Sequence, residues 1–148
     1  MYYFEKSVII DCPVEKAFVF HSDTNNLKKI SPPSIKVDIL KIDLPLKLNS
    51  VVELRVTQFG FFSSLWRVML AEFDEFSVIG DLQLKGPFKY WYHRHCFEEK
   101  EGKTLMTDKL EYDLPFGVVG KIAHALFIRK MIAGQFDFRH KKTKEVLE

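Results

Sequence analysis

The sequence predicts an α+β fold, in which a curved antiparallel sheet of about seven strands wraps around one long C-terminal helix and two short helices follow the first strand. Three observations predict it. Segments rich in β-branched and aromatic residues alternate with short, turn-like separators. A proline opens a helical pattern directly after the first of these segments. After Gly117 an apolar pattern with three- and four-residue steps continues to the end.

The first strand and the two short helices are the earliest elements. Tyr2–Ile10 has the composition of a strand. Pro13 then begins a helix that we expect to run through Phe20, because proline is tolerated in the first helical turn. A second short helix is predicted at Leu27–Ile30, and the prolines that begin at Pro32 must end it.

The middle of the chain predicts six further strands that are consecutive and antiparallel. Their separators, among them Gly60 and Glu101-Gly102, suit tight hairpins. The expected strands are Ile35–Ile42, Val51–Thr57, Leu65–Phe73, Phe76–Leu84, Phe88–Glu98 and Thr104–Asp113.

The terminal helix has a broad apolar arc, which predicts that it is more deeply enclosed than a surface helix. Phe127, Met131 and Phe138 are expected to point toward the sheet. A concave sheet and a single helix leave a space between them, and that space is the candidate site. We expect one domain over residues 1–148.

Composition limits the classes of partner. Phenylalanine occurs 14 times and aromatic residues make up 14% of the chain, which is typical of a dense core or of a pocket for an apolar ligand. The net charge of +2 is small, so no nucleic-acid partner is expected. The basic run from Arg139 to Lys144 is interpreted as a solvated helix face. No segment resembles a signal peptide or a membrane span, so the expected location is the cytoplasm.

The segment from Gly86 to Phe97 carries the densest group of chemically useful residues. Strand geometry places Trp91, His93, His95 and Phe97 on one face. If the hairpin turns at Glu101-Gly102, three cross-strand pairs follow, namely Phe97 with Met106, His95 with Asp108 and Trp91 with Tyr112.

The pair of His95 and Asp108 has two interpretations. A carboxylate opposite an imidazole stabilises the charged histidine, as a catalytic pair requires. The same contact also satisfies two polar groups on an apolar face, and we favour that structural role because no nucleophile motif accompanies the pair. His93, His95 and Glu99 resemble the metal-binding strand of a cupin, but the remaining cupin spacing is absent. We therefore predict no metal and no cofactor.

Trp66 has two equally supported roles, in the cavity wall or in the ordinary core. The residues that we expect to contact a ligand are Trp66, Trp91, His93, His95, Phe97, Asp108, Tyr112, Phe127 and Met131.

The chain resembles the START-like, Bet v 1-like superfamily, in particular the bacterial SRPBCC proteins described as polyketide cyclase/dehydrase-like. The resemblance spans nearly the whole chain. It depends on Asp11 to Phe18, on Asn26-Leu27 before Pro32, on Gly86-Pro87-Phe88 with Trp91, His93, His95 and Phe97, and on Asp108, Tyr112 and Pro115.

This resemblance implies a helix-grip fold with a cavity for lipids, polyketides or other small hydrophobic molecules. Function must be argued from the site, because members of one fold differ in activity. The preferred hypothesis is binding or carriage of such a molecule. The alternatives are a cyclase or dehydratase that uses the pair of His95 and Asp108, and a protein-interaction module with a collapsed cavity. The sequence leaves the oligomeric state open.

Overall fold

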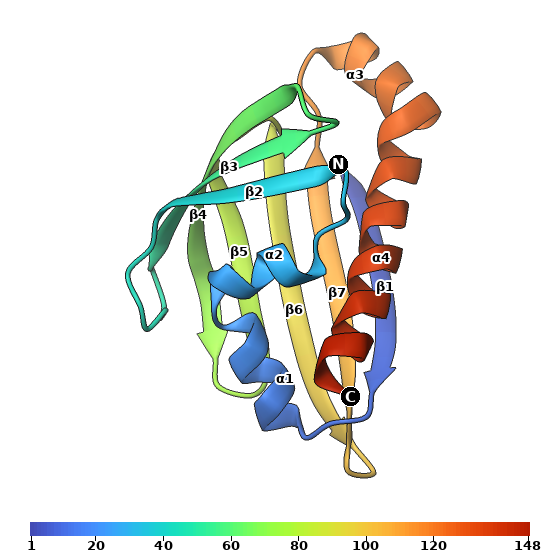
Figure 1. The fold of residues 1–148 in the computed structure, drawn as a ribbon. Coiled ribbons are helices and arrows are strands. Elements are labelled where there is room, and N and C mark those ends of the chain that lie inside the picture. The colour runs from blue at the N-terminus through green and yellow to red at the C-terminus, as the bar shows by residue number, and fades with distance from the viewer.

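A seven-stranded antiparallel sheet forms the body of the protein in the computed structural model, which describes residues 1–148 (Figure 1). The spatial order is β1-β7-β6-β5-β4-β3-β2, so the predicted meander is confirmed and β1 lies beside β7. The strands are β1 (Tyr2–Ile10), β2 (Ile35–Lys41), β3 (Val51–Gln58), β4 (Phe62–Asp74), β5 (Val78–Lys85), β6 (Tyr90–Lys100) and β7 (Lys103–Asp113).

Four strands begin at other residues than predicted, and for β7 the difference is one residue, since it starts at Lys103 and not at Thr104. β4 starts at Phe62 and not at Leu65, because the hairpin is closed tightly by Phe59 and Gly60, both with positive φ. β5 starts after Phe76, whose φ of 61° belongs to a turn and not to a strand. β6 starts after Phe88, because the Gln83 side chain satisfies both backbone polar groups of Phe88.

Irregular pairing bends the sheet. The register shifts between Ile39 and Lys41 in β2, and at two places in β4, between Arg67 and Val68 and between Leu70 and Glu72. Extra residues of this kind increase local twist and curvature. As a result β2 and β3 run across the view of Figure 1, whereas β1, β6 and β7 run along the terminal helix.

The helices lie at both ends of the chain. α1 (Val14–His21) and α2 (Leu27–Ile30) follow β1, with a short 3-10 turn, η1 (Thr24–Asn26), between them. The terminal helix consists of α3 (Gly117–Ala123), a π-helical turn η2 (His124–Ile128) and α4 (Arg129–Leu147). The buried stripe of α4, which faces the sheet, consists of Ile132, Phe136, His140, Thr143 and Leu147.

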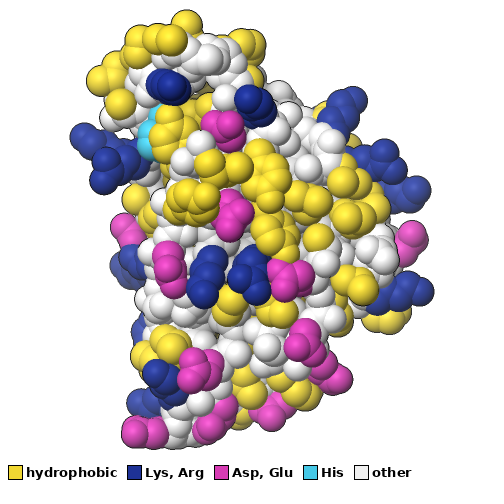
Figure 2. Space-filling view, turned by 180° about the vertical axis from the view of Figure 1, so that it is seen from behind, with side chains coloured by type: hydrophobic (Ala, Val, Ile, Leu, Met, Phe, Trp, Pro, Cys, Tyr) yellow, Lys and Arg dark blue, Asp and Glu magenta, His cyan; other side chains and the backbone are white.

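The first part of the terminal helix is exposed, contrary to the expected deep enclosure. Val118 is 71% exposed and Leu126 is 74% exposed. The reason is that α3 makes few or no contacts with the strands, and its main neighbour is η2, the next turn of the same helix. Figure 2 shows apolar side chains gathered at this end of the molecule. No helix of the protein is long and apolar enough to cross a bilayer.

The core is divided into two clusters. The larger one contains Phe18 of α1, Phe97 of β6 and Leu147 of α4, among others. The smaller one joins Leu110 and Tyr112 of β7 to Ile132 and Phe136 of α4. The expected pocket between the sheet and α4 is lined by parts of both clusters.

Candidate functional site

A cavity of about 190 Å³ lies between the concave face of the sheet and α4. Of its 32 lining residues, 19 are hydrophobic, so the wall suits an apolar ligand with a few polar contacts. β3 and β4 contribute apolar side chains such as Leu54 and Leu70, and α4 contributes Met131 and Phe136.

Aromatic rings form one wall of the cavity. The Trp66 and Trp91 rings meet edge to face at 5.3 Å, and Phe88 lies 4.6 Å from Trp91. The Phe88 ring is positioned by the two hydrogen bonds between the Phe88 backbone and Gln83. Trp66 thus has both of the positions that the sequence left open, because it lines the cavity and also packs against the larger core cluster.

The predicted hairpin register is confirmed. Glu101 and Gly102 form the turn with φ values of 54° and 80°, the conformation of a two-residue hairpin loop that follows the twist of the strands. The pairs of His95 with Asp108, Trp91 with Tyr112 and Phe97 with Met106 all follow from this turn.

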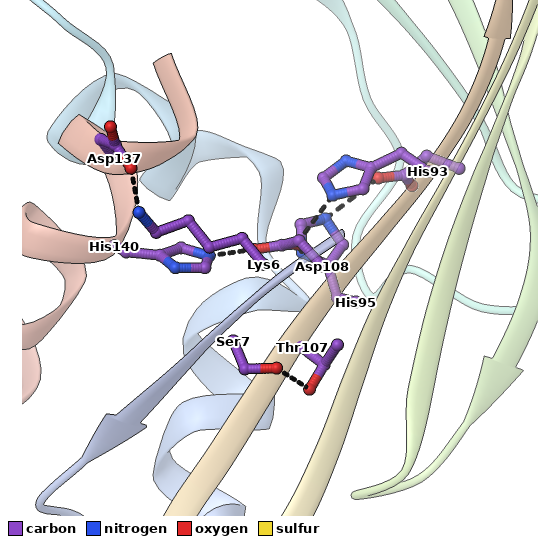
Figure 3. A network of polar contacts seen from close by, with 9 residues as sticks. Lys6, Ser7, His93, His95, Thr107, Asp108, Asp137 and His140 are labelled. Atoms are coloured by element: carbon purple, nitrogen blue, oxygen red, sulfur yellow. Dashed lines mark hydrogen bonds and ion pairs between the residues drawn. The ribbon is translucent and has the colours of Figure 1, made fainter. Parts of the chain in front are cut away.

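The Asp108 carboxylate is the centre of a larger network than the predicted pair (Figure 3). His93 Nε2 donates to Oδ1 over 2.7 Å, and His140 of α4 contacts Oδ2. His95 Nδ1 lies 2.8 Å from Oδ1 but outside hydrogen-bond geometry, so this contact is chiefly electrostatic. Asp108 is only 2% exposed, and three imidazoles therefore replace the water around one buried carboxylate.

The surroundings favour the charged forms of both Asp108 and His95. Burial opposes ionisation of Asp108, but the positive charge of His95 and the three histidine contacts hold the pKa of that carboxyl well below its usual range. Burial also opposes protonation of His95, yet the Asp108 carboxylate outweighs it and, with Asp81, raises the pKa of His95 to about 9. At neutral pH, His95 is thus an imidazolium between two carboxylates, with Nε2 3.4 Å from Asp81.

Two neighbouring histidines are neutral at the same pH. Burial, together with the charge of His95, lowers the pKa of His93. The same two causes lower the pKa of His21 to about 4. The His21 ring is 5.4 Å from the His95 ring, and its Nδ1 donates to the Ala17 carbonyl over 2.8 Å. The cavity therefore contains charged and neutral imidazoles side by side.

Asp81, His93 and His95 are the residues with a spacing that suits a metal ion. Each offers one atom within 4.8 Å of the others, and two imidazoles with one carboxylate is a ligand set that transition metals use. Within the protein, His93 forms a hydrogen bond with Asp108, and His95 forms ion pairs with Asp108 and Asp81.

Six of the nine residues expected to contact a ligand line the cavity. They are Trp66, Trp91, His93, His95, Asp108 and Met131.

The other three residues lie elsewhere, and their placement corrects the expectation. Phe97 packs against Phe18 in the larger core cluster, with the two ring centres 5.6 Å apart. Tyr112 is buried in the smaller core cluster, where its hydroxyl contacts His124 Nε2 at 2.6 Å. Phe127 is 53% exposed, because Ile128 takes the inward position on that turn.

Two further expectations about the terminal helix are wrong. Phe138 does not face the main cavity and instead lines a more open surface pocket with Pro32 and Phe59. Arg139 lies in the main cavity and not on a solvated face.

Ten polar residues that line the cavity were missed by the sequence interpretation, and five of them surround or extend the charged network. Asp81 and His21 line the cavity from β5 and α1, and Arg139, His140 and Thr143 line it from α4. His140 and Thr143 follow Phe136 at four- and three-residue steps. Extending the apolar stripe through polar residues would have located them.

The long helix held in a bent antiparallel sheet, with an apolar cavity between them, defines the class of helix-grip ligand-binding folds. The chain belongs to the family described as polyketide cyclase / dehydrase and lipid transport, whose pattern matches residues 10–136. This match confirms the predicted membership of the SRPBCC, polyketide cyclase/dehydrase-like family.

Solved structures agree with the fold over the whole length. Protein CV1439 from Chromobacterium violaceum aligns with a TM-score of 0.80 at 10% identity, covering 100% of this chain and 99% of that one. A START superfamily protein from Mycobacterium smegmatis gives 0.73 at 17% identity, with 99% and 97% covered. The ginseng major latex-like protein 151 from Panax ginseng gives 0.73 at 12% identity, with the same coverage. No curated protein matches the chain.

Proposed function

We propose that the protein binds and carries a small hydrophobic molecule, lipid- or polyketide-like, in the cavity between the sheet and α4. The observation that carries this proposal is the combination of an apolar, aromatic wall with one polar region around His95 and Asp81. The wall removes the ligand from water, and the polar region orients one end of it.

The two tryptophans provide the test. Trp66 and Trp91 are the only tryptophans in the chain and both line the cavity, so their fluorescence reports its occupation. We expect a neutral apolar dye to quench this fluorescence on binding. Native mass spectrometry of protein purified from its own host is expected to show a co-purified small molecule.

A cavity-filling variant makes the test specific. Met131→Trp places a large ring in the cavity from α4, whereas Val119→Trp adds the same ring at an exposed position of α3. Because both variants add a tryptophan, dye binding is followed here by the fluorescence of the dye itself. Met131→Trp is expected to weaken dye binding at least tenfold, and Val119→Trp to leave it unchanged. Equal binding by both variants would place the dye outside the cavity and contradict the proposal.

One observation favours an enzyme of the cyclase or dehydratase type as the second candidate. Neighbouring groups whose pKa values are pushed apart form a general acid and a general base, and the pKa is about 9 for His95 and about 4 for His21. His95 would donate a proton to a carbonyl or hydroxyl oxygen, and neutral His21 would accept one from carbon.

His95→Phe distinguishes the two candidates. If His95 only orients the ligand, affinity is expected to fall by about 1–3 kcal/mol, the usual cost of losing one buried polar contact. If His95 is a general acid, turnover of a polyketide-like substrate falls by about two to four orders of magnitude with binding nearly intact. Native mass spectrometry separates the outcomes, since a carried ligand keeps its mass over time and a substrate does not.

A further inference from the structure

The buried polar atoms that lack a partner within the protein gather in one place. All five belong to residues that line the main cavity. For one of them, His95 Nδ1, the Asp108 carboxylate is 2.8 Å away. The other four are Trp66 Nε1, Arg139 Nε, His140 Nδ1 and Thr143 Oγ1. Buried polar groups in folded proteins almost always have partners, so this clustering marks where a ligand supplies them.

Two of these atoms restrict the chemistry of the ligand. The indole nitrogen of Trp66 and the guanidinium nitrogens of Arg139 can only donate hydrogen bonds. A molecule that satisfies them must therefore present acceptor oxygens on an otherwise apolar body.

Arg139 also requires negative charge. Burial lowers the pKa of Arg139, and Asp108 and Asp81 counter that effect only from a distance, without an ion pair or hydrogen bond. Asp108 is already occupied by three histidines, and Asp81 faces His95. The guanidinium, held 5.4 Å from the Phe136 ring, is thus the one cation of the cavity without a counter-ion.

We propose that the ligand is an amphipathic monocarboxylic acid, whose carboxylate pairs with the Arg139 guanidinium while its apolar body lies against Trp91 and Phe88 and presents one further acceptor oxygen to Trp66 Nε1. This inference rests on the proposed function and names the ligand class. A planar carboxylate matches the fork of an arginine. One unpaired cation beside two carboxylates favours a single negative charge over the double charge of a phosphate monoester.

Three probes with the same alkyl chain test the head group, namely decanoate, decan-1-ol and decyl phosphate. Each displaces the neutral dye in competition titrations at neutral pH. We expect wild-type protein to bind decanoate at least tenfold more tightly than either of the other two. Equal affinity for decanoate and decanol would overturn the carboxylate assignment, and tighter binding of decyl phosphate would overturn it in favour of a phosphate. Failure of all three probes and of the dye would instead contradict the proposed function.

Arg139→Met tests the residue, with Arg129→Met as the matched control at an exposed position of the same helix. Arg139→Met is expected to reduce decanoate affinity at least tenfold and to leave decanol affinity unchanged or improved. Arg129→Met is expected to change neither. Arg139→Lys keeps the positive charge but lacks the two parallel N–H donors of the guanidinium, so it should give an intermediate decanoate affinity. It replaces Arg139→Met in the test if that variant fails to fold. A preserved preference for decanoate in both Arg139 variants would overturn the proposal.

Discussion

Asp108 shows how one residue organises the polar part of the site. Its carboxylate is almost fully buried, and it joins His93 and His95 of β6 to His140 of α4 (Figure 3). Burying a carboxylate without partners at such a position would cost too much free energy. The contacts with three imidazoles offset this cost and allow Asp108 to be charged there. The contact with His140 also ties the sheet to the helix at the depth of the cavity.

Asp108→Asn is expected to lower the free energy of unfolding by about 3 kcal/mol, because it removes the buried charge that all three histidines face. Urea denaturation measures this change. Asp38→Asn is the control, since Asp38 forms only a long, exposed ion pair with Lys36 and should change stability by less than about 0.5 kcal/mol. Equal effects of both substitutions would contradict the role given to Asp108.

At the scale of single elements, the β6–β7 hairpin was predictable and the orientation of α4 was not. The hairpin depends on a local signal, Glu101-Gly102, and one turn fixes every cross-strand pair. The orientation of the terminal helix is set by which of two adjacent apolar rows faces the sheet. Phe127 belongs to one row and Ile128 to the other, and the two side chains are similar in hydrophobicity, so the sequence does not distinguish the rows. The buried row continues through two polar residues, His140 and Thr143. His140 contacts Asp108, and both residues line the cavity, so a search for apolar residues alone does not find them.

Two glycines test these elements with opposite expected signs. Gly102 has a φ of 80°, so Gly102→Ala strains the hairpin turn and should cost about 1 kcal/mol of unfolding free energy. Gly134 lies in α4 with open space around its Cα, so Gly134→Ala should stabilise the protein by about 0.5–1 kcal/mol. Urea denaturation of both variants checks the signs, and a stabilising Gly102→Ala would refute the turn assignment.

At the scale of the whole molecule, the order of β2 to β7, the long helix and the cavity between them followed from the sequence, whereas the place of β1 beside β7 did not. The alternation of apolar and polar residues along the strands and the turn residues between them are signals within short segments. Together they leave few topologies in which a meander covers one helix. The polar content of the cavity did not follow. Asp81 comes from β5, whereas Arg139 and His140 come from α4, and the bend of the sheet brings the two elements around one space.

The histidines predict a bell-shaped dependence of overall stability on pH, with a maximum near pH 6.5. Above that pH the unfolded chain has lost the proton that folded His95 keeps, since its pKa is raised from 6.5 to about 9. Stability then falls by up to about 3 kcal/mol as pH rises to 9. Below pH 6.5 His21 becomes protonated in the unfolded chain. In the folded protein it stays neutral, because its pKa there is about 4. The unfolded state therefore binds more protons, and stability falls as the pH decreases.

Denaturation of wild-type protein and of His95→Gln at pH 6.5 and pH 9 checks the alkaline side of this dependence. The variant is expected to lose most of the difference between the two pH values. A variant that keeps the full wild-type difference would show that another group titrates.

The pairing of β1 with β7 determines when the molecule can be completed. Ile10 pairs with Thr104 and Tyr2 with Tyr112, so β1 leaves the ribosome well before β7, the strand with which it pairs. Closing so long a loop is entropically costly, and folding rates decrease as contacts become more distant along the chain. Until that closure, β1 is an exposed strand with unpaired amides, a template on which nascent copies can associate. The interval between synthesis of β1 and of β7 is therefore when the chain depends most on protection from other chains.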